Sequence, residues 1–210
     1  MITDDLIAQG YVIGLDINSN AGKLNFKDVK ESNPSLSFVR AKSSEGTSLD
    51  FLWSYNKKTA ANAGFKIGSF HVFEDAEDVA SQAGGYTSIA ADTDLPPAIA
   101  LFHCKTNIYK AMDGLLSTLA KTTQSWGRTP SILTTQLMMS SVPQKYYADI
   151  LKYPLSLVQE GVSQPLVPNP WGQTGDWKTS LFNWHFLSQP IVVGGAKVSF
   201  SAFLDKKTGK

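Results

Sequence analysis

The apolar positions of the chain form short continuous runs that alternate with stretches of helical spacing. Short continuous apolar runs are typical of strands that are buried on both faces of a parallel sheet. Strands are predicted at residues 11–16, 36–42, 66–73, 95–103 and 131–137. Helices are predicted between them at residues 26–31, 51–63, 76–86 and 107–125. This alternation predicts a parallel sheet with crossover helices.

Beyond residue 137 the helical pattern fades. The pattern allows a short helix at 146–151 and predicts strands at 154–159, 182–187 and 197–200, with loops rich in proline and glycine between them. Five βα units followed by three further strands predict an α/β fold, an irregular eight-stranded barrel of the TIM type. We expect one barrel domain at 11–204, preceded by a helical prefix at 1–10 and followed by a polar tail at 205–210.

Composition and charge narrow the range of partners. Hydrophobic residues make up 42% and charged residues 18% of the chain, as in an ordinary globular protein. With 19 basic and 18 acidic residues the net charge is +1, which gives no electrostatic reason to expect nucleic acid or an anionic membrane as partner. Any ligand should be neutral or recognised locally.

The cysteine count and the first residues bear on the cellular setting. The single cysteine, Cys104, excludes an internal disulfide and is interpreted as a small buried side chain. The start of the chain carries Asp4 and Asp5 and lacks an apolar run long enough for a signal peptide or a membrane span. We therefore expect cytoplasmic synthesis, with any export by a non-classical route, or a setting in a phage particle or in phage lysis.

Titratable side chains near predicted strand ends are candidate functional groups. Asp16 ends the first strand, where the carboxyl end of a parallel strand opens onto a site. The other candidates are Glu45, Glu74, Asp75, His71, His103 and His185. Each of these has a simpler interpretation, as a solvated loop charge or a hydrogen-bonded structural side chain. Phosphate-loop, zinc-helix and nucleophile-elbow motifs are absent from the sequence, so we expect no cofactor and no metal.

Several short motifs occur in an order and spacing that are specific when taken together. They are GLDI at 14–17, VRAKSSEGT at 39–47, AGFKIGSFHVF at 63–73, DAEDVASQ at 75–82, LPP at 95–97, PWG at 170–172 and WHF at 184–186. Over about residues 11–203 they resemble the lysozymes of glycoside hydrolase family 25. The corresponding family motifs include KATEGT, a YHF strand and an LPP turn before the catalytic strand.

The resemblance implies a barrel that hydrolyses the β-1,4 bond between N-acetylmuramic acid and N-acetylglucosamine in peptidoglycan. This chemistry needs a proton donor and a second carboxylate at the anomeric side of the bond. The family's Asp-x-Glu pair after the prolines corresponds to Ala100 and Phe102, and its late-strand Asp corresponds to Ser199. Of the four acidic positions in the resemblance, Asp16 alone remains, and neither Ala100 nor Phe102 can transfer a proton.

Aromatic side chains and Asp16 are the candidates for binding a sugar. Aromatic faces suit the apolar faces of sugar rings, although packing in the core is an equally good explanation of such residues. Asp16 could accept hydrogen bonds from a sugar, or tie down its strand by pairing with a backbone donor, Arg40 or Lys42. The aromatic candidates are Phe70, Trp171 and Trp184, with Phe73 and Trp177 as further members of the set.

The sequence therefore predicts a barrel that is inactive as a muramidase. It would serve as a glycan-binding module, or as a structural, protein-interacting part of a phage particle or a secretion apparatus. The alternative is an active N-acetylmuramidase that uses Asp16 and relocated carboxylates. The expected partners are peptidoglycan or a related glycan, or a protein in a larger assembly, without nucleic acid and without a membrane span.

Overall fold

The computed structural model describes residues 2–159, 162, 165–174, 181–187 and 199–204. The strands are β1 (Tyr11–Ile17), β2 (Phe38–Glu45), β3 (Ser48–Leu49), β4 (Lys66–Val72), β5 (Ala98–Leu101), β6 (Ser131–Thr135), β7 (Leu155–Val158), β8 (Leu181–Leu187) and β9 (Ser199–Leu204). The α-helices are α1 (Ile2–Ala8), α2 (Phe26–Ser32), α3 (Trp53–Asn62), α4 (Val79–Ile89), α5 (Ile108–Trp126), α6 (Gln136–Ser140) and α7 (Tyr147–Ile150). Short 3-10 turns are η1 (Ser19–Ala21), η2 (Gln144–Tyr146) and η3 (Trp171–Thr174).

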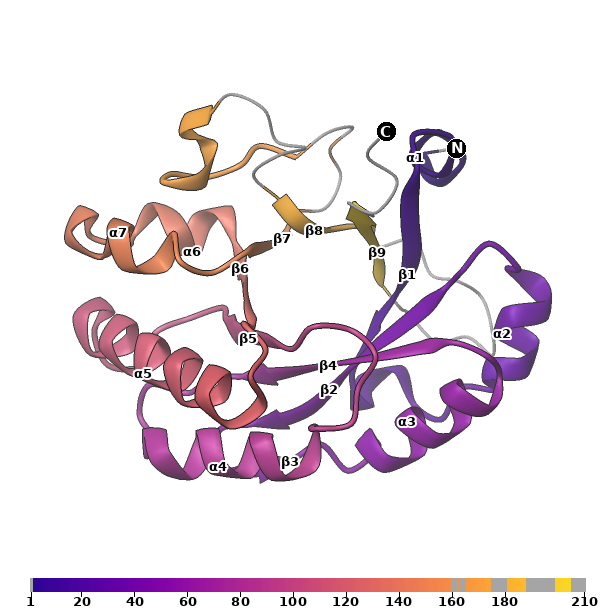
Figure 1. Cartoon of the computed structure of the whole chain (residues 1–210), viewed down its shortest axis with the longest axis horizontal. Helices are drawn as coiled ribbons and strands as arrows, with labels where there is room; N and C mark the ends of the chain where they lie inside the picture. The colour runs from indigo at the N-terminus through magenta and orange to yellow at the C-terminus, as the bar shows by residue number, and fades with distance from the viewer. Residues whose placement is uncertain (1, 160–161, 163–164, 175–180, 188–198, 205–210) are drawn as a thin grey trace.

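All the described strands except β3 close into a barrel. β1 pairs in parallel with β2, and the ring continues in parallel through β4, β5, β6, β7 and β8. β9 closes the ring by pairing antiparallel with both β8 and β1, while β3 is a short antiparallel partner of β2. Figure 1 shows the strands curving round from β1 through β4 and β6 to β9. The predicted eight-stranded α/β barrel is confirmed, and its last strand runs antiparallel to its neighbours.

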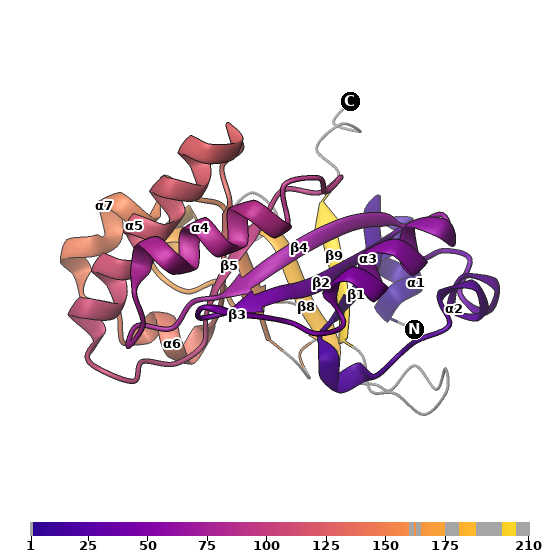
Figure 2. The same cartoon turned by 90° about the horizontal axis from the view of Figure 1, so that it is seen from below.

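The longer helices cover the outer face of the wall formed by β2, β4 and β5. α3 packs on β2 and β4, and α4 lies against α5 (Figures 1 and 2). The side chain of Asn107 caps α5 by accepting a backbone N–H, and Gly127, with a φ of 63°, ends it. The face formed by Met112, Leu115 and Leu119 is buried, as the helical spacing predicts.

Several element boundaries differ from the predicted ones, such as those of β5 (predicted at 95–103) and α4 (predicted at 76–86), and two of the differences have a clear local cause. The strand predicted to end at residue 42 continues as β2 to Glu45 and turns back into β3 at Gly46, whose φ of 54° favours glycine. The strand predicted at 131–137 ends at Thr135, because the Thr135 hydroxyl accepts the Met138 N–H at 3.1 Å and so starts α6.

The two ends of the chain differ in how far the structure describes them. Leu6 of α1 is buried in the main core, so the helical prefix packs on the barrel. The strand predicted at 197–200 is described from Ser199 and continues to Leu204, and the tail at 205–210 lies outside the described residues. Within the described part of the chain, no helix combines the length and the apolar character needed to cross a membrane.

The barrel has an outer and an inner core because side chains of a strand alternate between its two faces. On β5, Ile99 and Leu101 point outward into the main core beneath the helices. Ala98 and Ala100 point inward and belong to a separate buried cluster with Leu133. Phe70 and Val72 of β4 complete that inner cluster. The inner face of the barrel is therefore filled by side chains.

The interior is tightly packed at Gly14. A Cβ atom at Gly14 would lie 2.4 Å from the ring of Phe38, its neighbour on β2. Gly14→Ala should lower the free energy of unfolding by about 1–3 kcal/mol, the usual cost of overpacking. Gly84→Ala, at an exposed site on α4 with open space around the new methyl group, should raise it by about 0.5–1 kcal/mol. Urea unfolding measures both, and a neutral Gly14→Ala would refute the close contact.

Candidate functional site

The positions carried over from the family's acids meet at one end of the barrel. Asp16 lies near the carboxyl end of β1, Ala100 near that of β5, and Phe102 directly follows β5. Ser199 begins β9 and pairs in register with Asp16, so the antiparallel direction of β9 brings its first residue to this same end. The sequence alignment of these positions is therefore consistent with the fold.

Asp16 forms a buried ion pair with Arg40 of the neighbouring strand β2. The guanidinium contacts both carboxylate oxygens, with Nε to Oδ1 at 2.6 Å and Nη2 to Oδ2 at 2.8 Å. Arg40 also donates to Asn183 Oδ1 of β8 at 3.1 Å and to Ser156 Oγ of β7 at 3.5 Å. Because these strands lie on other sides of the ring, the Arg40 side chain must cross the inside of the barrel.

The ion pair supports the structural interpretation of Asp16. Both residues are buried, and a carboxylate held by two guanidinium N–H groups is a satisfied acceptor. Among the alternatives considered for its partner, the structure shows Arg40, while Lys42 Nζ instead lies 2.7 Å from Glu45 Oε2. Asp16 therefore ties β1 to β2 and, through Arg40, to β7 and β8.

Alanine occupies the position of the first acid in the family's Asp-x-Glu pair, and the side chains around it are apolar. Ala100 is fully buried in the inner cluster with Phe70, Val72 and Leu133. Leu133 is two residues beyond Ser131 on the same face of β6, and Ser131 accepts a hydrogen bond from Ser156 of the Arg40 network. The apolar cluster thus lies between that polar network and the barrel mouth. Phe102, 36% exposed, lies at the mouth itself.

Of the aromatic residues predicted to bind sugar, Phe70, Phe73, Trp171 and Trp184 belong to the core, and Trp177 lies outside the described residues. Phe70 lies in the inner cluster, while Trp171 and Trp184 lie in the main core. The indole N–H of Trp171 donates to the Tyr153 carbonyl at 3.2 Å, and that of Trp184 donates to the Gln159 carbonyl at 3.1 Å. A sugar could reach these rings only after their neighbours move, so their role in binding stays a prediction.

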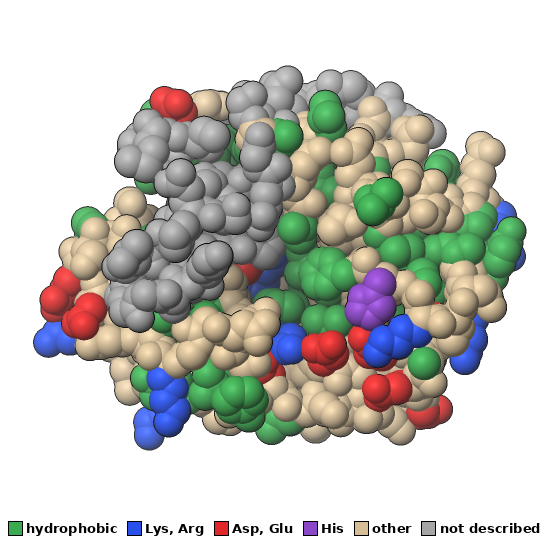
Figure 3. All heavy atoms as spheres, turned by 180° about the vertical axis from the view of Figure 1, so that it is seen from behind, with side chains coloured by type: hydrophobic (Ala, Val, Ile, Leu, Met, Phe, Trp, Pro, Cys, Tyr) green, Lys and Arg blue, Asp and Glu red, His purple; other side chains and the backbone are tan. Residues whose placement is uncertain are grey.

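A polar cavity of about 330 Å³ opens at this end of the barrel, beside β2 and β4. Figure 3 shows a face on which acidic and basic side chains and a histidine border a hollow with apolar side chains. The cavity combines two of the predicted acidic candidates with residues that strand-end reasoning did not single out. It is lined by Ser19, Lys42, Glu45, Ser48, Leu49, Asp50, Phe51, Glu74, Glu77 and Lys105.

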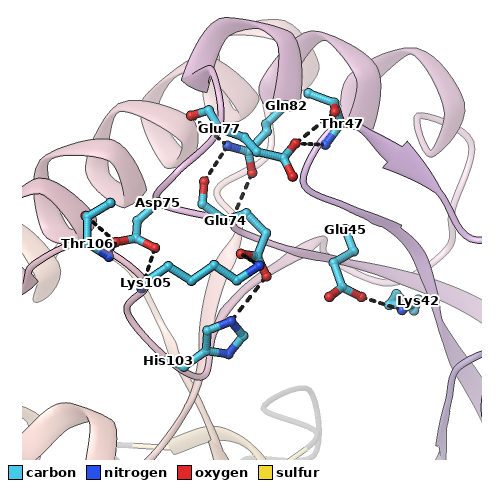
Figure 4. Close-up of polar contacts among 10 residues, drawn as sticks. All are labelled: Lys42, Glu45, Thr47, Glu74, Asp75, Glu77, Gln82, His103, Lys105 and Thr106. Atoms are coloured by element: carbon cyan, nitrogen blue, oxygen red, sulfur yellow. Dashed lines mark hydrogen bonds and ion pairs between the residues drawn. The ribbon is translucent and has the colours of Figure 1, made fainter.

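Glu74 is the buried carboxylate of this cavity. Its side chain is 3% exposed, and Lys105 Nζ lies 2.7 Å from Oε2 while His103 Nε2 lies 3.3 Å from Oε1 (Figure 4). The Lys105 contact is an ion pair, and neither Glu74 oxygen accepts a hydrogen bond of good geometry from the described residues. Its backbone is fixed by Gln82, which accepts the Glu74 N–H and donates to the Glu74 carbonyl. The carboxylate is therefore held in a fixed place next to the half-exposed side chains of Lys105 and His103.

The other acids around the cavity have separate partners. Lys42 is shared between Glu45 and the buried Asp50, whose Oδ2 lies 3.6 Å from Nζ. Glu77 accepts the N–H and the hydroxyl of Thr47, and these hydrogen bonds hold the pKa of Glu77 below its usual range.

Asp75, a predicted candidate, is instead directed toward the end of the loop before α5. It accepts the backbone N–H groups of Lys105 and Thr106 and the Thr106 hydroxyl. Burial opposes these hydrogen bonds, but together they lower the pKa of Asp75. Asp75 therefore has the structural role that its simpler interpretation gave it.

The histidines are divided between structural and surface positions. His71 is buried, stacks on Tyr86 and places Nδ1 2.9 Å from the Ser44 hydroxyl, so it lies outside the cavity wall. His103 is half-exposed beside Glu74. The side chain of His185 lies outside the described residues. Within the described residues no group of three metal-binding side chains occurs, and Cys104 is half-buried with its pKa raised by burial.

A closed α/β barrel with a polar cavity at the carboxyl ends of its parallel strands has the architecture of barrel enzymes. No family model matches the sequence, and no curated protein sequence matches it significantly. The structure is similar to the bacterial lysozyme from Streptomyces coelicolor, with a TM-score of 0.78 and 23% identity over 91% of each chain.

Two further solved structures show the same similarity. For a family 25 glycosyl hydrolase from Bacillus anthracis the TM-score is 0.75 at 15% identity, over 91% of this chain and 88% of that one. For a family GH25 lysozyme from Aspergillus fumigatus it is 0.75 at 19% identity, over 92% of this chain and 93% of that one. The chain therefore has the fold of the family 25 lysozymes, as its motifs indicated.

The ion pair predicts a large stability effect at Asp16. Asp16→Asn leaves the Arg40 guanidinium without its counter-charge inside the barrel, so the free energy of unfolding should fall by about 3–5 kcal/mol. Urea unfolding followed by circular dichroism measures the change. The double variant Asp16→Leu, Arg40→Met removes both charges and should lose less than the single variant. Equal stability of Asp16→Asn and wild type would contradict the structural role.

Buried His71 predicts a loss of stability in acid. Burial lowers its pKa to about 4, although the carboxylates of Glu45 and Glu77 act in the opposite direction. The unfolded chain binds this proton near pH 6.5 and the folded chain only near 4, so stability should fall by about 3 kcal/mol as the pH drops through that window. Unfolding of wild type and His71→Gln across the window tests this, and parallel curves for the two proteins would refute it.

Proposed function

We propose that this protein is a lysozyme-type barrel that binds cell-wall glycan without hydrolysing it. The observation that carries the proposal is the composition of the barrel centre. Ala100 is buried in an apolar cluster at the position of one family acid, and Asp16, the acid that remains, is bound to Arg40. Similarity to lysozymes and muramidases supports peptidoglycan or a related glycan as the ligand.

The loss of acids is a sufficient reason for the loss of hydrolysis. General acid catalysis contributes about 10²–10⁴-fold to such a reaction, and glycoside cleavage also needs a second carboxylate near the anomeric carbon. Phe102 places an apolar ring at the mouth where the family has its proton donor. The centre of this barrel therefore offers neither the acid nor the assisting base.

An active glycosidase with relocated carboxylates is the second candidate. It is favoured by Glu74, a nearly buried carboxylate that lines the same cavity as the more exposed Glu45. In this alternative, Glu74 would donate the proton and Glu45 would assist. Against this alternative, Lys105 Nζ lies 2.7 Å from Glu74 Oε2, so a substrate would have to displace this ion pair before it could reach the carboxylate.

A protein partner within a phage particle or a secretion apparatus is the third candidate. It is favoured by large apolar side chains exposed in segments that follow the carboxyl ends of the strands, among them Phe51, Leu137 and Leu166. Exposed apolar patches of this kind are typical of protein interaction sites when they are contiguous. The same residues also suit contact with the apolar faces of sugars, so the glycan remains our first choice.

Incubation with purified peptidoglycan tests the proposal. The wild-type protein should co-sediment with insoluble peptidoglycan and release no reducing ends, whereas a family 25 lysozyme releases them under the same conditions. Release at a rate comparable to that enzyme would contradict the proposal. Abolition of that release by Glu74→Gln, with Glu31→Gln at an exposed ion pair as control, would then establish the relocated active site.

A further inference from the structure

The cavity beside β2 and β4 has an excess of negative charge. Four carboxylates, those of Glu45, Asp50, Glu74 and Glu77, line it against the two ammonium groups of Lys42 and Lys105. Lys42 serves two of the carboxylates at once, and the donors from Thr47 to Glu77 are neutral groups. A cavity with this balance attracts a cation and repels an anion.

Glu74 gives the cavity a specific point of attachment. Its carboxylate is 3% exposed and accepts no hydrogen bond of good geometry from the described residues, although it lines the cavity. A buried carboxylate in this condition is costly and gains from a donor that brings both a charge and well-directed hydrogen bonds. A primary ammonium group offers three such N–H donors around one positive charge.

Lys105 shows that an ammonium group fits at this point. Its Nζ lies 2.7 Å from Glu74 Oε2, and the side chain that carries it is 54% exposed. Figure 4 shows the Lys105 side chain extending to the Glu74 carboxylate from one side, with Glu45 on the opposite side of that carboxylate. Since an exposed lysine side chain is held weakly, a ligand's ammonium group can displace it and take its place.

The rim of the cavity adds an apolar surface. Phe51 is 78% exposed and Leu49 is 54% exposed, and both belong to the lining residues. An aromatic ring and an aliphatic side chain beside a polar cavity suit a ligand with one apolar face and several polar groups, such as a pyranose ring. The volume of about 330 Å³ lies at the lower end of the range of small-molecule sites.

From these contacts we infer that the cavity is a binding site for a primary ammonium group carried by a cell-wall component, with Lys105 as its internal competitor. The inference rests on the proposed function in taking its ligand from the cell wall. Two sources share this chemistry, an amino sugar that lacks its N-acetyl group and the side-chain amine of a diamino acid in the stem peptide. An N-acetylated sugar has no such charge and would not compete with Lys105.

Isothermal titration with defined ligands tests the inference. The probes are a glucosamine tetrasaccharide, the N-acetylglucosamine tetrasaccharide as its uncharged match, and Nα-acetyl-lysine amide as the diamino-acid arm. The glucosamine oligomer or the lysine derivative should bind at least about tenfold more tightly than the acetylated oligomer. If the glucosamine oligomer binds more tightly than the lysine derivative, the ligand is the amino sugar. If the lysine derivative binds more tightly, the ligand is the diamino acid.

Variants of the cavity residues show whether each side chain strengthens or weakens binding of the amine probe. Lys105→Met should tighten binding of the amine probe about tenfold, because it removes the competitor, and Lys121→Met on the surface of α5 should change nothing. Glu74→Gln should weaken binding about tenfold, and the exposed Glu45→Gln gives a second loss that does not depend on a buried site.

The results that overturn the inference differ from those that overturn the proposed function. Equal affinity for the amine and the acetylated oligomer, or weaker binding after Lys105→Met, would overturn the ammonium site while leaving a non-hydrolytic glycan binder in place. Release of reducing ends from peptidoglycan would overturn the proposed function and is measured in a separate assay. Thermal unfolding of each variant shows that a change in affinity is not a loss of fold.

Discussion

The barrel depends on one buried guanidinium group. Arg40 extends from β2 across the interior and contacts Asp16 on β1, Ser156 on β7 and Asn183 on β8, so it joins strands that are distant in the sequence. Burying such a charge is costly unless it is paired and hydrogen-bonded, which requires the four strands to keep their places. The carboxylate that pairs with it occupies the position of a family acid.

This constraint determines what the centre of the barrel can do. A carboxylate that neutralises an arginine is unsuited to transfer a proton, and the cluster around Ala100 between this pair and the mouth is apolar. The two features support each other, because an apolar cluster over the ion pair excludes water from it and strengthens it. The polar cavity lies apart from this packed centre, beside β2 and β4.

The sequence predicted the fold more fully than the site. Apolar runs and capping residues such as Asn107 and Gly127 depend on local physics, so the order of strands and helices followed from them. The antiparallel direction of β9 could not be predicted, because the apolar pattern of a strand does not depend on the direction in which the strand runs in the sheet. Asp16 and Ala100 were placed at the barrel end by motif order, but the choice of Arg40 as partner required three-dimensional contacts.

The cavity illustrates why site residues escape sequence reasoning. Glu45 and Glu74 could be singled out because they lie at strand ends. Lys105 lies in the loop after β5, and it contacts Glu74 because β5 pairs with β4. The position of a residue at a strand end predicts which groups meet at one end of the barrel. It does not predict which charges remain in excess after the groups have paired. Here that excess is negative and lies beside an exposed aromatic ring. The rim of the barrel thus carries the negative charge that the proposed binding of an ammonium group requires.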